Sequence, residues 1–65
     1  MSVAERVARK VNERFEKNRL KPTELDRLFD EEIEKENLDK VEAFNVRSEA
    51  AIIAARLRVE SRRAS

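Results

Sequence analysis

Carboxylates are the side chains of this sequence with the clearest capacity for chemistry. Asp26, Asp30 and Glu34 are spaced by four residues, so they line one strip of a helix if this segment is helical. The adjacent run Asp30-Glu31-Glu32 does not converge on one point, because consecutive helical residues point in different directions. A divalent cation needs several oxygen ligands around it. We therefore interpret these residues as a solvated acidic face and predict no metal-binding residues.

The residue types that perform most acid–base and nucleophilic catalysis are missing from the sequence. It contains no His, Cys, Tyr or Trp, and so offers no imidazole base and no thiolate nucleophile. It also contains no Gly, which excludes the glycine-rich loops that bind phosphate. We predict that the protein is not an enzyme, that it has no catalytic or cofactor-binding residues, and that it takes no cofactor or small-molecule substrate.

The charges are segregated along the chain. Residues 1–21 carry seven Lys or Arg and three Glu, residues 22–42 carry three basic and nine acidic residues, and residues 43–65 carry five basic and two acidic residues. A basic, an acidic and a second basic segment attract one another when they pack side by side. We interpret most of these charges as solvated faces that favour such packing within the fold.

Composition and capping residues predict an all-α fold. Charged residues, mainly Glu, Lys and Arg, make up 45% of the chain, and the lack of Gly disfavours tight hairpins between strands. Ser2 and Glu5 form a capping-box pattern at the start of a first helix, and Pro22 suits the first turn of a second. We predict a single domain over residues 1–65, either a small three-helix bundle or a helical hairpin with a long third helix. The apolar periodicity places the helices at about 3–18, 22–36 and 39–62.

The start of the third helix is less well determined. Asn37 is suited to end the second helix, and Asp39 is suited to cap the next one. Asn45 and Ser48 are also residues that stop and restart helices. The third helix is therefore either continuous or broken near Asn45.

The third helix has two apolar faces. One carries Val46, Ala50, Ile53 and Leu57, and the other carries Phe44, Ala51, Ile52, Ala55 and Val59. One face can cover the first two helices, but a 65-residue chain has little left to cover the second. We predict a non-enzymatic protein–protein interaction module, a homodimer or a complex with another protein. Four of its predicted interface residues, Val46, Ala50, Ile53 and Leu57, have the spacing of a coiled-coil seam, and Ala54 is the fifth.

One stretch resembles a known DNA-binding motif. Residues 39–52 resemble a helix-turn-helix, with a short helix ending at Phe44, a turn at residues 45–47 and a second helix from Ser48. In that family the second helix enters the major groove, and the turn commonly holds a glycine followed by an apolar residue. Asn45 and Val46 occupy those two positions. The resemblance implies a small DNA-binding protein as the alternative function.

The residues of this nucleic-acid alternative are mostly basic. A strip of four cations runs along the first helix, and the others lie on the third helix. The net charge of +1 and the lack of aromatic residues among the cations argue for weak binding without base specificity. The predicted residues are Arg6, Lys10, Arg14, Lys17, Arg47, Ser48, Arg56, Arg58, Arg62 and Arg63.

The longest apolar run, residues 50–55, is far short of the ~20 residues that span a bilayer. We expect a small soluble protein in the cytoplasm, with no membrane partner. The absence of Gly, Cys, His, Trp and Tyr is also typical of designed helical bundles, and it occurs by chance in short natural proteins.

Overall fold

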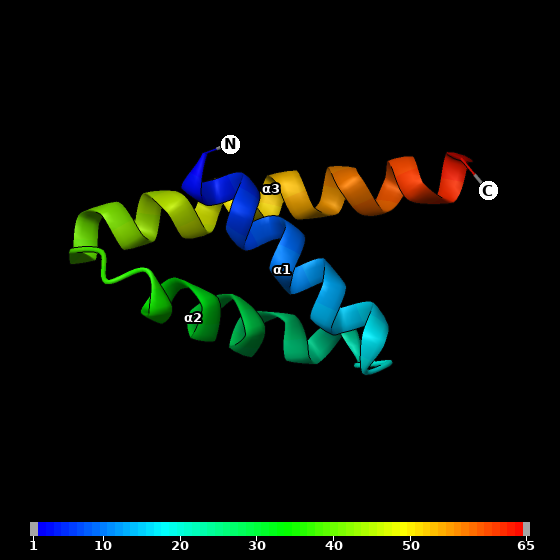
Figure 1. Cartoon of the computed structure of the whole chain (residues 1–65), viewed down its shortest axis with the longest axis horizontal. Coiled ribbons are helices and arrows are strands. Elements are labelled where there is room, and N and C mark those ends of the chain that lie inside the picture. Colours follow the sequence, from blue (N-terminus) through cyan, green and yellow to red (C-terminus); the bar gives the residue numbers. More distant parts are fainter. Residues whose placement is uncertain (1, 65) are drawn as a thin grey trace.

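The computed structural model describes residues 2–64 and contains three α-helices and no strand over that range. The predicted all-α fold class is confirmed. α1 crosses the middle of α3, and α2 lies beside the N-terminal half of α3, so the C-terminal turns of α3 extend beyond the other two helices (Figure 1). The helices are α1 (Val3–Lys17), α2 (Leu25–Lys35), preceded by a short 3-10 turn, η1 (Pro22–Glu24), and α3 (Lys40–Ala64).

α1 is bounded by local signals at both ends. The Ser2 hydroxyl accepts a hydrogen bond from the backbone N–H of Glu5 at 3.2 Å, which is one half of the predicted capping box. Beyond the last turn, Arg19 has a φ of 50°, a left-handed conformation that reverses the chain direction. The N–H of Leu20 then donates to the carbonyl of Phe15 at 3.1 Å. The helix therefore ends in a closed turn, although the sequence has no glycine for this position.

The residues predicted to bound α2 and α3 lie at the ends of these helices, but regular α-helix begins later than predicted after Pro22. Pro22 begins the 3-10 turn η1, and regular α-helix starts only at Leu25. At the other end of α2, Asn37 adopts a φ of 55°, which confirms it as the helix-ending residue. Asp39 caps α3, because its carboxylate accepts a hydrogen bond from the N–H of Glu42 at 2.8 Å.

α3 is one continuous helix through the position where a break was the alternative. Asn45 and Ser48 are exposed within it, and the segment has no Pro or Gly to remove or weaken a backbone hydrogen bond. The turn expected at residues 45–47 is therefore absent. The resemblance to a helix-turn-helix is wrong at its defining feature, since the supposed two helices are a single element.

The core lies where the three helices meet. Asn12 of α1 donates a side-chain hydrogen bond to the carbonyl of Ala54 at 3.0 Å, so a hydrogen bond as well as apolar contacts joins α1 to α3 where they cross. Four buried residues are alanines spaced by four on each helix, Ala4 and Ala8 on α1 and Ala50 and Ala54 on α3, which permits close approach of the two backbones. The buried apolar residues are Ala4, Val7, Ala8, Val11, Leu28, Phe29, Ile33, Ala50 and Ala54.

Ion pairs join α1 to α2, as the segregated charges predict. Arg6 pairs with Glu36, and Arg14 pairs with Glu31 at 2.7 Å and with Glu32 at 3.0 Å. The hydrogen bond from Arg14, with smaller contributions from other nearby cations, holds the pKa of Glu31 below its usual value. The same hydrogen bond raises the pKa of Arg14. Basic α1 is thus tied to acidic α2 at two places.

α3 is joined to α2 through the predicted acidic strip. Arg47 donates to Asp30 at 2.8 Å and to Asp26 at 3.2 Å, so the two carboxylates share one guanidinium. Glu34, the third member of the strip, is exposed. Asp26 and Asp30 of the acidic face therefore bind a neighbouring helix of the same chain.

One buried charge was not predicted from the sequence. The side chain of Glu32 is only 3% exposed, and it accepts hydrogen bonds from Arg14 and from Lys35, the latter at 3.1 Å. Two cations satisfy this carboxylate, as burial of a charge requires. Its position in a run of acidic residues gave no sign that it faces inward.

Candidate interaction surface

The two apolar faces of α3 are exchanged relative to the prediction. The face predicted to be external is the inner face of the fold: Ala50 and Ala54 are fully buried, and Val46 and Ile53 pack against the core. Leu57 is half-buried. The predicted interface of Val46, Ala50, Ile53, Ala54 and Leu57 is corrected accordingly, because most of its surface is occupied by α1 and α2.

The physical reason lies in the side-chain sizes and the polar neighbours of the inner face. Small residues at 50 and 54 let α3 approach the alanines of α1 at the crossing. Arg47 and Arg58 flank this face, and both find partners in the same chain: Arg47 on α2, and Arg58 at Asn12 of α1, 2.8 Å away. The edge of the inner face that carries Arg47 and Arg58 is therefore bonded to the other two helices.

The opposite side of α3 carries an exposed apolar stripe. Val41, Phe44, Ile52 and Val59 have exposed fractions of 73%, 71%, 61% and 50%. With Ser48, Ala51 and Ala55 between them, these residues share one side of the helix from residue 41 to residue 59, about five turns at 3.6 residues per turn. We call this surface the outer stripe; it consists of Val41, Phe44, Ser48, Ala51, Ile52, Ala55 and Val59.

One edge of the outer stripe is lined by charges at heptad spacing. Glu42, Glu49, Arg56 and Arg63 are seven residues apart, and all four are exposed. Within residues 2–63, none of them forms an ion pair with another part of the chain, whereas Arg47 on the other side of α3 binds two carboxylates. We call these four residues the charged edge.

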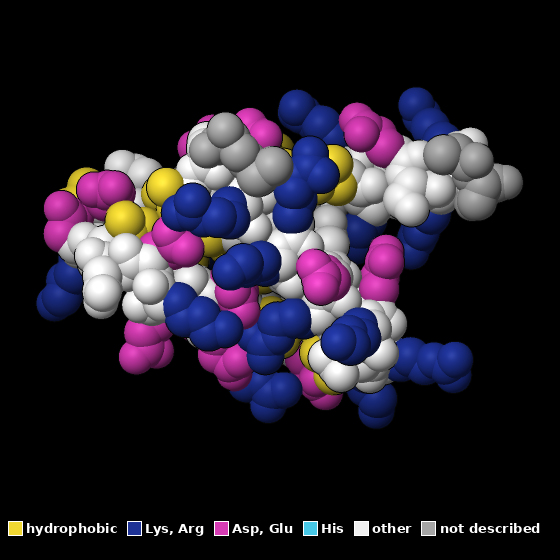
Figure 2. Space-filling view, viewed as in Figure 1, with side chains coloured by type: hydrophobic (Ala, Val, Ile, Leu, Met, Phe, Trp, Pro, Cys, Tyr) yellow, Lys and Arg dark blue, Asp and Glu magenta, His cyan; other side chains and the backbone are white. Residues whose placement is uncertain are grey.

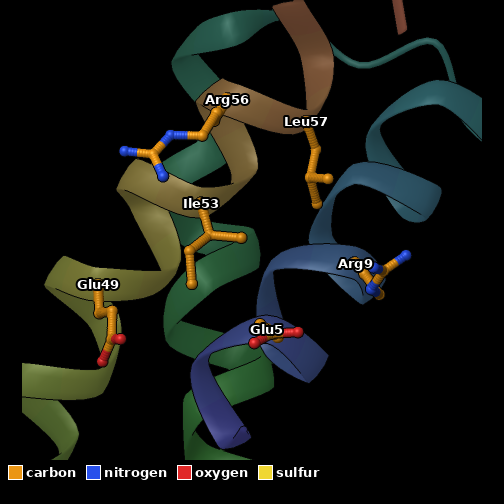
Figure 3. Close-up of a pocket in the computed structure, with 6 residues that line it drawn as sticks. All are labelled: Glu5, Arg9, Glu49, Ile53, Arg56 and Leu57. Carbon is orange, nitrogen blue, oxygen red and sulfur yellow. The ribbon is translucent and has the colours of Figure 1, made fainter. Parts of the chain in front are cut away.

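A shallow hollow lies beside this edge, in the angle between α1 and α3 (Figure 3). It measures about 390 Å³, and Ile53 and Leu57 form its apolar wall. In the close-up, Ile53 and Leu57 point toward α1, whereas Glu49 and Arg56 stand on the outer side of α3. The hollow is a mixed polar and apolar depression, lined by Glu5, Arg9, Glu49, Ile53, Arg56 and Leu57.

The residues predicted for nucleic-acid binding are scattered over several surfaces. Arg14 and Arg47 pair with carboxylates of α2, Arg6 pairs with Glu36 directly after α2, and Arg58 is bonded to Asn12. Ser48 lies within the outer stripe, away from a helix terminus. Figure 2 shows Lys and Arg side chains interleaved with Asp and Glu on the face that it presents. The remaining predicted residues are exposed: Lys10, Lys17, Arg56, Arg62 and Arg63.

The part of the chain that the structure describes contains no group of three acidic side chains placed to hold a metal ion. No helix within residues 2–64 combines the length and apolar character needed to cross a bilayer. No protein-family model, curated protein or solved structure matches the chain.

Proposed function

We propose that the protein is a non-enzymatic interaction module that self-associates through the outer stripe of α3. The observation that supports this most is the alignment of Val41, Phe44, Ile52 and Val59 on one exposed side of a preformed helix. Scattered exposed apolar residues are normal on a monomer, but an aligned stripe of this kind is typical of an interface. A second chain on this stripe removes these side chains from water.

The size of the chain also favours association. A domain of about 60 residues buries only ~60% of the surface of its unfolded chain, so its own core stabilises it weakly. Among residues 2–63, the largest fully buried side chains are Leu28, Val7 and Val11, and four of the nine buried apolar residues are alanines. Packing two outer stripes together adds a second apolar layer to this small core.

The adjacent residues Ile52 and Ile53 provide a matched test, because they lie on opposite faces of one helix. Ile52→Glu is expected to give a folded monomer, since the side chain is 61% exposed and a charge there opposes only association. Ile53→Glu is expected to destabilise the fold itself, because Ile53 packs on the core. Circular dichroism reports folding, and light scattering after size-exclusion chromatography reports mass.

Thr23→Glu serves as the charge control, because this exposed residue of η1 lies outside α3. It should leave both helicity and mass unchanged. If Ile52→Glu and the unmodified chain have the same mass at every concentration, the outer stripe is not the interface. If Ile53→Glu is the folded monomer instead, the two faces of α3 have been assigned the wrong way round.

A further inference from the structure

The charges along the charged edge of α3 attract those of a second copy of the same edge that runs in the opposite direction. Read from the N-terminus, the edge is Glu42, Glu49, Arg56 and Arg63, two acids followed by two bases. Within residues 2–63 these side chains form no ion pair, so they remain available to a partner. When a second α3 runs antiparallel along this edge, each Glu of one helix lies opposite an Arg of the other.

We propose that the outer stripe binds a second copy of this chain in antiparallel orientation; this rests on the self-association proposed above. A two-fold axis perpendicular to two antiparallel helices brings the same edge of each helix together. Glu42 then faces Arg63 of the partner subunit, and Glu49 faces Arg56 of the partner subunit. The symmetry repeats both contacts, so the dimer has four attractive pairs along one side.

The opposite orientation has no comparable set of contacts. In a parallel pair, the charged edge meets the other edge of the partner's stripe, where the heptad positions are Phe44, Ala51 and Arg58. Glu49 then faces Phe44 of the partner subunit, and Arg63 faces Arg58 of the partner subunit. That arrangement contains a repulsive pair and no attractive one, so the charges select the antiparallel dimer.

The apolar residues fit the same register. When Glu49 is opposite Arg56 of the partner subunit, Ile52 lies over the partner's Ala55, and Val59 lies over the partner's Ser48. Ile52 and Val59 therefore each meet a small side chain, which allows the two helices to interdigitate at close range along this part of the stripe. The register fixed by charge and the register fixed by size agree.

The charge pairs set orientation more than they set affinity. Exposed ion pairs contribute little individually, and like charges placed opposite one another oppose the wrong arrangement. A lasting contact still depends on burial of Phe44, Ile52 and Val59. Orientation and affinity are therefore separable by experiment, the first through the charged edge and the second through the outer stripe.

Two double variants test which edges meet. Glu42→Arg with Glu49→Arg makes the edge all basic, and Arg56→Glu with Arg63→Glu makes it all acidic. In an antiparallel dimer each variant repels itself, so we expect the dimer dissociation constant to rise roughly tenfold or more for both. The equimolar mixture of the two should associate at least as tightly as the unmodified chain. The fourfold variant inverts every charge but keeps complementarity, so it should also dimerise normally.

A parallel dimer gives a different result with the same proteins. There the all-acidic variant gains an attractive contact, because the carboxylate introduced at position 63 faces Arg58 of the partner subunit. This variant should therefore self-associate more tightly than the unmodified chain. Weakened self-association of both double variants with recovery in the mixture supports the proposal; tighter self-association of the Arg56→Glu, Arg63→Glu variant overturns it.

A distance measurement tests orientation directly. The chain has no cysteine, so Lys40→Cys provides a single site for a spin label at the exposed start of α3. In the antiparallel register, the two labelled positions are about 39 Å apart along the helix axis, from a rise of 1.5 Å per residue. In a parallel dimer they lie about 10 Å apart, the interaxial distance.

The outcomes separate the two proposals. A dimer by mass with a long label distance supports both self-association and antiparallel orientation. A dimer with a short distance overturns the antiparallel arrangement and leaves self-association intact. A monomer at every concentration overturns both proposals, so the mass tests self-association and the label distance tests orientation.

Discussion

The two faces of α3 carry similar apolar residues, yet one is buried and the other is exposed. The inner face holds Ala50 and Ala54 against α1, while the outer face holds Ala51 and Ala55 at the surface. The apolar residues of the two faces therefore do not explain why only one face is buried. The two edges between these faces differ: Arg47 and Arg58, on one edge, bind partners on α2 and α1, whereas within residues 2–63 the charged edge forms no ion pair. Contacts with the other two helices, and not the apolar pattern of α3 alone, thus decide which of its two apolar faces packs inside.

The largest effect is expected from enlarging one alanine on each face. Ala54→Leu forces extra volume into the crossing of α1 and α3 and should reduce the free energy of unfolding by about 1–3 kcal/mol. Ala55→Leu adds the same atoms to the exposed face and should change the stability of the monomer by less than about 0.5 kcal/mol. Urea denaturation at low protein concentration measures both. Equal losses for the two variants would break the distinction between the faces.

The next effect concerns the buried carboxylate of Glu32. Arg14→Leu leaves this group with Lys35 alone and should lower the free energy of unfolding by about 1–2 kcal/mol. Arg47→Leu is the control, because Arg47 pairs with exposed carboxylates: the side chains of Asp26 and Asp30 are 89% and 68% exposed. It should lower the free energy of unfolding by less than about 1 kcal/mol. A larger loss for Arg47→Leu would show that Glu32 is better solvated than its position implies.

A smaller effect is expected from acid titration. The pKa of Glu31 is lowered in the folded state, chiefly by the hydrogen bond from Arg14, so the unfolded chain takes up a proton first as the pH falls. Its contribution to stability is therefore present above pH 4.5, the usual pKa, and is lost as the pH falls below it. Glu31→Gln should reduce the fall in the urea midpoint between neutral and acid pH. An unchanged pH dependence in this variant would contradict the Arg14–Glu31 contact.

The smallest effect is expected from DNA. Arg6, Arg14 and Arg47 already pair with α2, and the net charge is +1, so any duplex binding should be electrostatic and should weaken steeply with salt. Sedimentation of a labelled duplex should therefore be unchanged by the protein at about 0.15 M salt. Tight binding there, with one base preference altered by substitution at Arg47 or Ser48, would favour the DNA-binding alternative.

The elements of the fold were predictable because their signals are local. Ser2, Asn37 and Asp39 act within a few residues of the helix ends that they define, and each does so as the sequence predicts. The sequence does not determine whether α3 is continuous, because Asn45 and Ser48 are compatible with either a break or an exposed place within a helix. Local residue preference does not distinguish these cases, whereas packing along the whole helix does.

The orientation of α3 was not predictable from its own periodicity, since both sides have apolar residues at helical spacing. The choice depends on contacts with residues distant in the sequence, such as Arg47 with Asp26 and Asp30. One signal was present: two carboxylates spaced by four on the second helix match a single guanidinium on the third. The inward position of Glu32 depends likewise on Arg14, eighteen residues earlier in the chain.

The most direct test of the central claim is sedimentation equilibrium of the unmodified chain over a wide range of concentrations. Association through the outer stripe predicts a mass that rises from 7.6 kDa toward twice that value as concentration increases. The Ile52→Glu variant should remain at the lower value over the same range. A constant mass of 7.6 kDa for the unmodified chain would contradict self-association, and the exposed stripe on α3 would then require a different partner.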